Sequence, residues 1–398
     1  MGSAMTIETK NLTTAAASAW GWPATLGERL EKAFGWRDLT ESTLAAVADA
    51  GEETRVNRAL VRAIGEHGLL RELFPPLDPA DRRISAVTLC LLKESLGQRS
   101  TATEDALGLQ GLGFNPIYRW GSEEQVDEWY EPVVSGDAVA AFAMTEPDAG
   151  SDVAALALEA HRDGGDYLLS GTKVWISNAP DADVYVVFAR TGNGNARTSQ
   201  TAFIVPGDAP GLTGEPLELI VSHPVGRLVF DNVRVPSSAV VGEVGQGWEI
   251  GMKTLEQFRI SVGAFGLAVS QAALDATISF LKRREQFGAP LSTRQALAHR
   301  VAELTSQLTA ARLLIYHTAE RFDAGEPDGR LSAMAKLRAT ETAQEVVDAC
   351  VQMHGACALE QGHLLGHLYR EVRAPRIYEG ASEVLREIAA RSLFAAAP

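Results

Sequence analysis

The stretch "ALAHRVAELTSQLTAARLLIYHT" (Ala296–Thr318) decides the fold class of the C-terminal part of the chain. Its apolar residues recur every three or four positions, at Leu297, Val301, Leu304, Leu308, Ala311, Leu314 and Ile315. This spacing is typical of a helix that buries one stripe in a bundle. A second stretch of the same kind, "SAMAKLRATETAQEVVDACVQMHG", ends at Gly355. We therefore predict a C-terminal helical bundle over residues 241–398.

Toward the N-terminus the apolar period shortens over residues 137–240. "DYLLSGTKVWISN" (Asp166–Asn178) is typical of a strand, a Ser-Gly turn and a second strand. "DVYVVFAR", "TAFIVP" and "RLVFDNVRVP" follow as short β-branched and aromatic runs between Gly, Pro and Asp clusters. Short strands without intervening helices predict an antiparallel β domain, either a sheet or a barrel.

Residues 25–136 have helical spacing and predict an N-terminal helical domain. We expect Gly97 to end one helix in the C′ position, and Ser122 with Gln125 to begin another with a capping box. The fold class is therefore α+β, mainly α. Residues 1–24 begin with "MGSAM", which resembles the remnant of an expression tag, and are otherwise poorly defined.

Composition narrows the possible functions. The chain has 398 residues, 46% of them hydrophobic, a net charge of −15 and three cysteines. The acidic balance argues against nucleic acid and anionic membranes as partners, and three cysteines are too few for a disulfide framework. We see no apolar run of the ~18–20 residues that a membrane helix needs, and no signal peptide. We expect a cytoplasmic protein.

Several stretches have residues suited to chemistry, although each has a simpler interpretation. The loop "AFAMTEPDAGSD" (Ala141–Asp152) offers hydroxyl and backbone N–H groups for a flat polar ring or a phosphate. Trp175 and Ser177, two apart on a strand, are suited to stack on a ring and bond to its edge, or Trp175 is a core residue. The cations of "KRREQFG" (Lys282–Gly288) complement a helix end or bind phosphate.

No nucleotide-binding, hydrolase or metalloprotease motif is present. His363 and His367 stand four apart, but no third ligand is evident, so we predict no metal site. Glu379 lies in "IYEGAS", after Arg370, Arg373 and Arg376, and is either a surface carboxylate or a catalytic one.

Taken together, these stretches resemble the acyl-CoA dehydrogenase family over roughly residues 55–394. The motifs that carry the resemblance stand in the family's order: "MTEPDAGSD", "GTKVWISN", "RREQFG", "QALAHRVAEL", "VQMHG" and "IYEGASEVLREIAAR". The resemblance implies the same three-part fold, a bound FAD, and oxidation of an acyl thioester between its α and β carbons.

The resemblance also assigns roles to residues. Glu379 matches the base that removes the α-proton while the β-hydride passes to flavin N5. In some relatives the base stands at another position, which falls here on Phe258. Phenylalanine has no acidic group, so the sequence selects Glu379. The matches to substrate contacts are Ser151, Glu256, Arg259 and Gly380. Phe142, Met144, Thr145, Trp175 and Ser177 match residues around the flavin ring, and the remaining matches to FAD contacts, some from a neighbouring subunit, are Arg284, Gln286, Phe287, Gln295, Gln352, Gly355, Ala356, Ala381 and Glu383.

Three departures from the family pattern stand out. Ala381 replaces a usual threonine after the Glu-Gly pair, Ala356 replaces a usual second glycine, and "FPPLDPADRR" (Phe74–Arg83) replaces a Gly-rich segment.

Several functional alternatives stay open. The substrate is an acyl-CoA or an acyl group on a carrier protein. Other members of the same fold are oxygen-using oxidases or monooxygenases, and some are non-catalytic. The resemblance implies an electron-transferring flavoprotein as acceptor and a homo-oligomer, dimer or tetramer.

Overall fold

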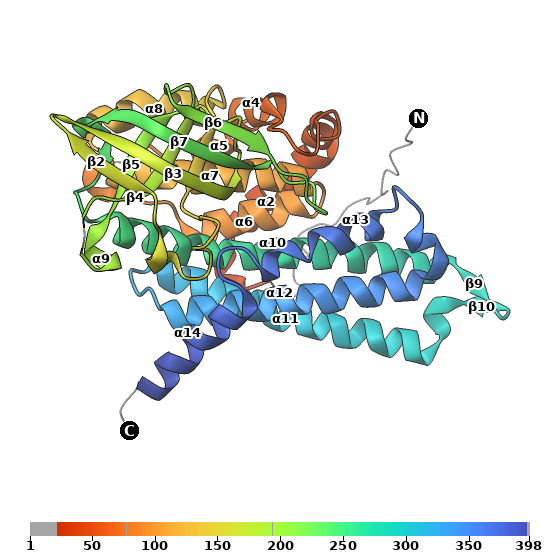
Figure 1. The fold of residues 1–398 in the computed structure, drawn as a ribbon. Helices are drawn as coiled ribbons and strands as arrows, with labels where there is room; N and C mark the ends of the chain where they lie inside the picture. The colour runs from red at the N-terminus through yellow and green to blue at the C-terminus, as the bar shows by residue number, and fades with distance from the viewer. Residues whose placement is uncertain (1–21, 77, 193, 396–398) are drawn as a thin grey trace. The chain divides into compact units, whose positions relative to one another are not determined.

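The computed structural model describes residues 22–76, 78–192 and 194–395 (Figure 1). The predicted tag remnant, and most of the segment 1–24, lies outside these residues. The chain divides into two compact units. The bundle unit takes residues up to 41, 89–101 and from 259 onward, and the sheet unit takes residues 42–88 and 102–258.

The sheet unit is built on an eight-stranded sheet among the described residues. The strand order is β6-β7-β3-β2-β4-β5-β8, with β1 also paired to β4. The bounds are β1 Ala140–Ala143, β2 Glu159–Asp163, β3 Asp166–Ser177, β4 Val184–Arg190, β5 Gln200–Pro206, β6 Leu212–Pro216, β7 Val225–Pro236 and β8 Val240–Val241. Most neighbours are antiparallel as predicted, but β1 and β2 run parallel to β4, so the sheet is mixed.

Strand β3 corrects one expectation. The predicted Ser-Gly turn does not form, because Asp166–Ser177 is one continuous strand paired with β7. The pairing shifts register between Leu169 and Gly171, so the glycine makes a bulge rather than a reversal. A second shift lies between Lys173 and Ile176. It falls at Trp175, so plain alternation does not determine which way that ring points.

The helices of the sheet unit follow the predicted pattern. The capping box at Ser122 forms, and Gly136 ends the same helix with a left-handed φ of 81°. The predicted C′ role of Gly97 is wrong: this glycine is still helical, and it is not among the residues with positive φ. The bounds are α3 Ala45–Ala48, α4 Arg58–Glu66, α5 Leu69–Leu73, α6 Ala86–Gly97, α7 Thr101–Trp120, α8 Glu123–Ser135 and α9 Ala196–Ser199, of which α6 and α7 also give residues to the bundle unit.

The bundle unit contains the long helices predicted from the sequence. Helix α12 ends at Gly355 as predicted. The hairpin of β9 and β10 joins α10 to α11 and extends beyond their ends (Figure 1). The bounds are α2 Arg29–Leu39, α10 Gly247–Arg283, β9 Glu285–Gln286, β10 Ala289–Pro290, α11 Gln295–Asp323, α12 Gly329–His354, α13 Leu364–Glu371 and α14 Ser382–Ala395. Helix α10 contributes residues to both units.

Helix α10 is more apolar than we expected from the sequence. An 18-residue window of it has a mean hydropathy of 1.4, so by length and composition it meets the criteria for a membrane span. Since 72% of that window is buried inside the protein, α10 is accounted for as a core helix.

A buried ion pair joins the helices of the bundle unit. Glu94 of α6 accepts hydrogen bonds from Arg312 at 2.8 Å and from the Tyr316 hydroxyl at 2.8 Å. Arg312 also donates to Gln271 of α10 at 3.0 Å. Burial raises the pKa of Glu94, against the opposing effects of Arg312 and Tyr316. This network fixes the rotation of α6 and therefore the direction of the neighbouring Lys93.

Candidate active site

Glu379 lies in a short loop between the turn Ala374–Arg376 and helix α14. Its φ is +50°, and that of Gly380 is +102°. A glutamate rarely adopts left-handed backbone, which costs about 1–3 kcal/mol and persists only where surrounding contacts enforce it. The local sequence explains only half of this geometry, since Gly380 tolerates positive φ and Glu379 does not.

Two cations enforce the loop conformation. Lys336 of α12 is fully buried, and its Nζ donates to the carbonyl of Tyr378 and, at 2.7 Å, to that of Gly380. Arg259 of α10 donates its Nε–H to the carbonyl of Glu379 at 3.2 Å. Three consecutive carbonyls, those of residues 378–380, are therefore held by side chains from two other helices.

The Glu379 carboxyl is poised to take up a proton. The residue is half-buried, but its Oε2 is covered and has no hydrogen-bond partner among the described residues. Burial raises the pKa of Glu379, and the charges of Lys93, Lys336 and Arg259 oppose that rise. Burial favours the protonated acid and the cations favour the carboxylate, which is the balance that a general base needs.

Trp175 and Ser177 end strand β3 in the sheet unit. The Trp175 side chain is 56% exposed, and its φ is +58°. Ser177 Oγ lies 3.0 Å from His223 Nε2, and His223 Nδ1 lies 3.4 Å from Asp105 Oδ2. No local sequence pattern connects these three groups, because Asp105, Ser177 and His223 are far apart in sequence.

A Ser–His–Asp chain is also the arrangement of a hydrolase triad. Such a site needs a free backbone N–H near the serine to stabilise an oxyanion. The N–H of Asn178, directly after Ser177, is already donated to the Pro224 carbonyl at 2.8 Å. The chain of contacts is therefore better suited to orient the Ser177 hydroxyl than to activate it.

A second buried ion pair supports Thr145. Lys173 of β3 donates to Glu146 Oε1 and to the Met144 carbonyl, both at 2.8 Å. Glu146 also accepts the N–H groups of Ala157 at 2.6 Å and Leu158 at 2.9 Å. Burial lowers the pKa of Lys173 to about 8, and Glu146 opposes this shift. Sequence analysis assigned no role to Lys173 or Glu146. Glu146 appears there only as the acid that follows Thr145 in "MTEPDAGSD".

The rest of the loop Ala141–Asp152 is ordered around the Lys173–Glu146 ion pair. The Thr145 carbonyl accepts from the Val174 N–H at 3.0 Å, which ties the loop to β3. Phe142 packs against Phe188 with 4.7 Å between the ring centroids, and Met144 is buried. The structure therefore brings Thr145 next to the strand that carries Trp175, as the prediction for a ring-binding site requires.

The hairpin of β9 and β10 carries Phe287 at its tip. Phe287 and Gly288 both have positive φ, +54° and +78°, as a two-residue type I′ turn requires. Phe287 is 92% exposed. Arg294, which sequence reasoning missed, donates to the carbonyls of Gln286 at 2.9 Å and Phe287 at 3.1 Å.

The remaining predicted cofactor contacts lie at the surface of the single chain. Arg284, Gln286, Gln295, Gln352, Gly355, Ala356 and Glu383 are exposed, and Ala381 is half-buried. Ser151 is also exposed. Phe258 is buried, and Glu256 on the same helix is half-buried.

The two histidines of "GHLLGH" have separate roles. His363 Nδ1 accepts the Leu365 N–H at 3.2 Å and caps α13, whereas His367 Nε2 lies 2.8 Å from Thr101 Oγ1. His363 instead lies near His354 and Cys357, with ligand atoms within 4.8 Å of one another. Because the cap occupies the Nδ1 lone pair, the neutral ring carries its proton on Nε2, so His363 has no free lone pair for a metal.

The residues present fit a flavin dinucleotide. An exposed tryptophan beside an oriented hydroxyl suits a flat ring with polar edges. The exposed Arg284 and Gln286, next to an exposed aromatic residue, suit a phosphate and a second ring.

Three family models match the chain in order. They are the acyl-CoA dehydrogenase N-terminal domain over residues 35–137, the middle domain over 141–233 and the C-terminal domain over 245–394. The short-chain specific acyl-CoA dehydrogenase of Bos taurus mitochondria is 35% identical over 362 residues, covering 90% of this chain and 88% of that protein. The chain belongs to the acyl-CoA dehydrogenase family, and the predicted family, fold class and oxidoreductase class are confirmed.

Solved structures agree with this assignment. A chain in the structure of the electron transferring flavoprotein of Acidaminococcus fermentans matches with a TM-score of 0.85 and 30% identity, covering 97% of this chain and 99% of that one. A glutaryl-CoA dehydrogenase from Mycobacterium smegmatis in complex with FADH2 matches with a TM-score of 0.85 and 27% identity, covering 94% and 96%.

Proposed function

We propose that this protein is an FAD-dependent dehydrogenase that introduces a double bond between the α and β carbons of an acyl-CoA, with Glu379 as the base. The observation that carries the proposal is the covered, unpartnered Oε2 of a glutamate held in strained backbone between cations. Strain of this kind is concentrated at functional sites.

When bound, FAD supplies the acceptor for the β-hydride. The chain's own residues do the rest. Glu379 takes the α-proton onto its carboxylate. Thr145 and Ser177 hold the polar edge of the cofactor, and Trp175 covers its ring. The matching structure with FADH2 supports this cofactor.

The substrate assignments change in one respect. We propose Ser151 and Glu256 as contacts to the CoA portion and Gly380 as the residue that leaves room for the thioester. Arg259, predicted to contact substrate, has its Nε–H on the Glu379 carbonyl. We therefore propose that Arg259 acts first on the base loop.

We also propose a substrate class and an electron acceptor. The short-chain specific relative makes short acyl-CoA esters the first candidates, ahead of an acyl group on a carrier protein. An electron-transferring flavoprotein is the proposed acceptor, a use supported by the matching chain in a structure of such a protein. We also propose a cytoplasmic homo-oligomer.

The test is anaerobic bleaching of the flavin by a panel of acyl-CoA esters. Glu379→Gln is expected to retain FAD and to slow bleaching at least about 10²-fold, the usual contribution of a general base. Glu387→Gln, an exposed acid on the following helix, serves as the control and should bleach at the wild-type rate.

Other results of the bleaching experiment would contradict the proposed base or the proposed function. Bleaching of Glu379→Gln at the wild-type rate would refute the base. A flavin that no free ester bleaches points to a carrier-bound substrate or to an oxygen-using enzyme. Protein without flavin points to a non-catalytic relative.

A further inference from the structure

We propose that Lys336 is a positioning residue for the base: it holds the loop of residues 376–382, here called the base loop, in the conformation that presents the Glu379 carboxylate. The inference rests on the proposed role of Glu379. Sequence reasoning had placed Lys336 only in a bundle helix.

The contacts of Lys336 bracket the base. Its Nζ donates to the carbonyls of the residues directly before and after Glu379, while the Arg259 Nε–H takes the carbonyl between them. The ammonium also lies 5.8 Å from the centroid of the Tyr378 ring. These bonds turn three successive carbonyls toward cations, which accounts for the left-handed backbone at Glu379.

Helix α12 also holds both ends of the base loop. Glu341 accepts hydrogen bonds from Arg376 Nε at 3.1 Å and from Ser382 Oγ at 2.7 Å. Lys336 lies five residues earlier on the same helix. One rigid helix therefore fixes the two ends of the loop and its centre, which is how a scaffold holds a catalytic group within the tolerance that chemistry requires.

Packing alone does not account for a lysine here. A buried ammonium is costly unless something in the site uses its charge. Burial lowers the pKa of Lys336, whereas the charge of Glu379 opposes that shift and Arg259 adds to it. Lys93 of α6 also acts on Glu379. The groups that face Lys336 are thus Glu379, Arg259 and the Tyr378 ring, and Lys93 faces Glu379.

The role predicts two effects of Lys336→Met, which keeps side-chain length and removes the charge. The base loop should loosen, and the Glu379 carboxyl should titrate at higher pH, because one of the cations that favour its ionised form is gone. A lysine without contacts to the base loop would affect neither property.

The experiment uses FAD-loaded enzyme and two readouts besides turnover. Hydrogen exchange reports on the backbone amides of residues 376–385. Infrared difference spectra across a pH series report the protonated carboxyl band of Glu379, assigned by its loss in Glu379→Gln. Lys253→Met, an exposed lysine of α10, is the control.

We expect Lys336→Met to exchange its loop amides at least about tenfold faster and to bleach about 10–100-fold more slowly, as a misplaced catalytic group does. Its Glu379 band should persist to higher pH, Lys336→Arg should restore part of each property, and Lys253→Met should match wild type. Unchanged loop exchange and unchanged Glu379 titration in Lys336→Met would overturn the proposal.

The proposal can still be tested if Lys336→Met does not fold or if Glu379 is not the base. If Lys336→Met does not fold, Lys336→Gln, which also removes the charge, and Glu341→Gln take its place: unchanged loop exchange in Glu341→Gln together with an unchanged Glu379 band in Lys336→Gln would overturn the proposal. If Glu379→Gln bleaches normally, the proposed base is wrong, but loop exchange and the infrared titration still decide whether Lys336 holds the loop.

Discussion

At the scale of single residues, three side chains predicted to meet cofactor or substrate have left-handed backbone. They are Trp175, Phe287 and Glu379, with φ of +58°, +54° and +50°. Only Phe287 sits in a two-residue hairpin turn that favours this conformation. For the other two the surrounding contacts must supply the stabilisation, and for Glu379 these contacts are the bonds from Lys336 and Arg259.

His223 allows a prediction at this scale. The Asp105 carboxylate only accepts, so neutral His223 carries its proton on Nδ1 and accepts the Ser177 hydroxyl hydrogen on Nε2. The Ser177 oxygen is then left to accept from a donor, such as a reduced flavin. In His223→Leu the Ser177 hydroxyl hydrogen no longer has His223 as its acceptor, so the Ser177 oxygen is no longer held in position to accept from a reduced flavin. We expect the flavin midpoint potential to fall by about 20 mV, the equivalent of roughly 1 kcal/mol for one hydrogen bond.

The measurement is a spectroscopic redox titration of the bound flavin. His161→Leu, an exposed histidine on β2, is the matched control and should leave the potential unchanged. A potential in His223→Leu equal to that of wild type would show that Ser177 is not oriented toward the flavin by His223.

The family resemblance of the sequence predicts Glu379 as the base, but the sequence does not predict the contacts that hold its loop. "IYEGAS" marks Glu379 because a carboxylate between an aromatic residue and a glycine has a recognisable local pattern. Lys336 and Arg259 lie 42 and 120 residues from the nearest backbone atoms they contact, so no local pattern connects them. Contacts of this kind depend on how helices pack, which periodicity alone does not specify.

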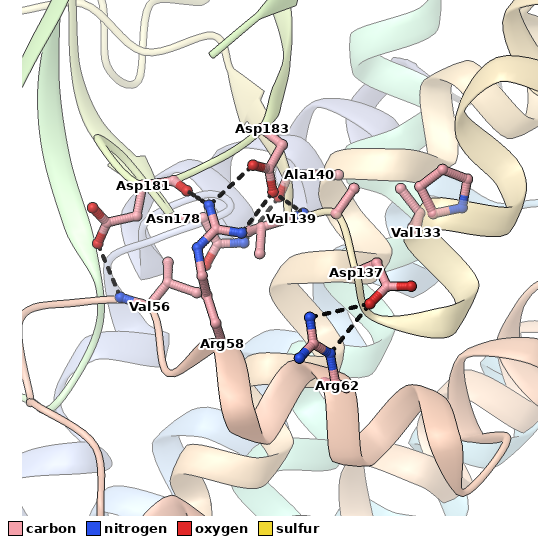
Figure 2. A network of polar contacts seen from close by, with 12 residues as sticks. Val56, Arg58, Arg62, Val133, Asp137, Val139, Ala140, Asn178, Asp181 and Asp183 are labelled. Carbon is pink, nitrogen blue, oxygen red and sulfur yellow. Dashed lines mark hydrogen bonds and ion pairs between the residues drawn. The ribbon is translucent and has the colours of Figure 1, made fainter. Parts of the chain in front are cut away.

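At the scale of elements, a polar network joins helix α4 to the two strands that support the predicted flavin edge (Figure 2). Arg58 donates to Asp183 at 2.8 Å and to the Asp181 carbonyl at 2.6 Å. Asp183 accepts the Val139 N–H at 2.7 Å, and the Asn178 side chain donates to the Ala140 carbonyl at 2.9 Å. The network therefore anchors the start of β1 and the end of β3, where Ser177 lies.

Asp181 makes this network sensitive to acid. Burial alone would raise the pKa of Asp181, but hydrogen bonds from Arg55 and the Val56 N–H lower it below its ordinary value. A carboxyl with a lowered folded-state pKa stabilises the fold above its unfolded pKa, about 3.9, and loses that contribution as pH falls through the folded pKa. We expect Asp181→Asn to cost about 1 kcal/mol at pH 7, a value reduced because water screens the half-exposed Arg55.

Urea unfolding at pH 7 and at pH 3 checks this prediction. The difference between Asp181→Asn and wild type should be largest at pH 7 and shrink at pH 3, where the wild-type carboxyl begins to protonate. Asp208→Asn, an exposed carboxylate of the same sheet unit, should match wild type at both values. An equal difference at both pH values would mean that ionisation of Asp181 does not contribute.

The elements themselves were largely predictable, and the failure at β3 has a tertiary cause. Helices with a clear apolar stripe and a glycine stop, such as α12, form as predicted. The Ser-Gly pair of β3 predicts a turn, because glycine favours turns. The long partner strand β7 keeps β3 extended through a bulge instead, so tertiary pairing overrides the local preference.

At the scale of the whole molecule, the two halves of the predicted site differ in exposure. Lys93 and Lys336 of the bundle unit are buried and Glu379 and Arg259 are half-buried, whereas the predicted cofactor contacts Arg284, Gln286, Gln295 and Gln352 are exposed. Large apolar side chains are exposed as well, including Phe287 at 92%, Phe394 at 89% and Leu359 at 78%. We propose that a second copy of the chain covers these residues and that the cofactor's phosphate and adenosine end binds there.

This arrangement predicts that FAD retention depends on association. Diluting the enzyme below the concentration at which its subunits dissociate should release FAD, which is seen as a rise in free-flavin fluorescence at the same concentration at which sedimentation shows smaller species. Phe287→Ala should shift both transitions to higher protein concentration, because burying a phenylalanine contributes about 1.5–3 kcal/mol. Ile220→Ala removes another exposed apolar side chain, 71% exposed and in the sheet unit, and should shift neither. FAD that stays bound to fully dissociated subunits would show that each chain holds its cofactor alone, and the exposed arginine and glutamines would then need another partner.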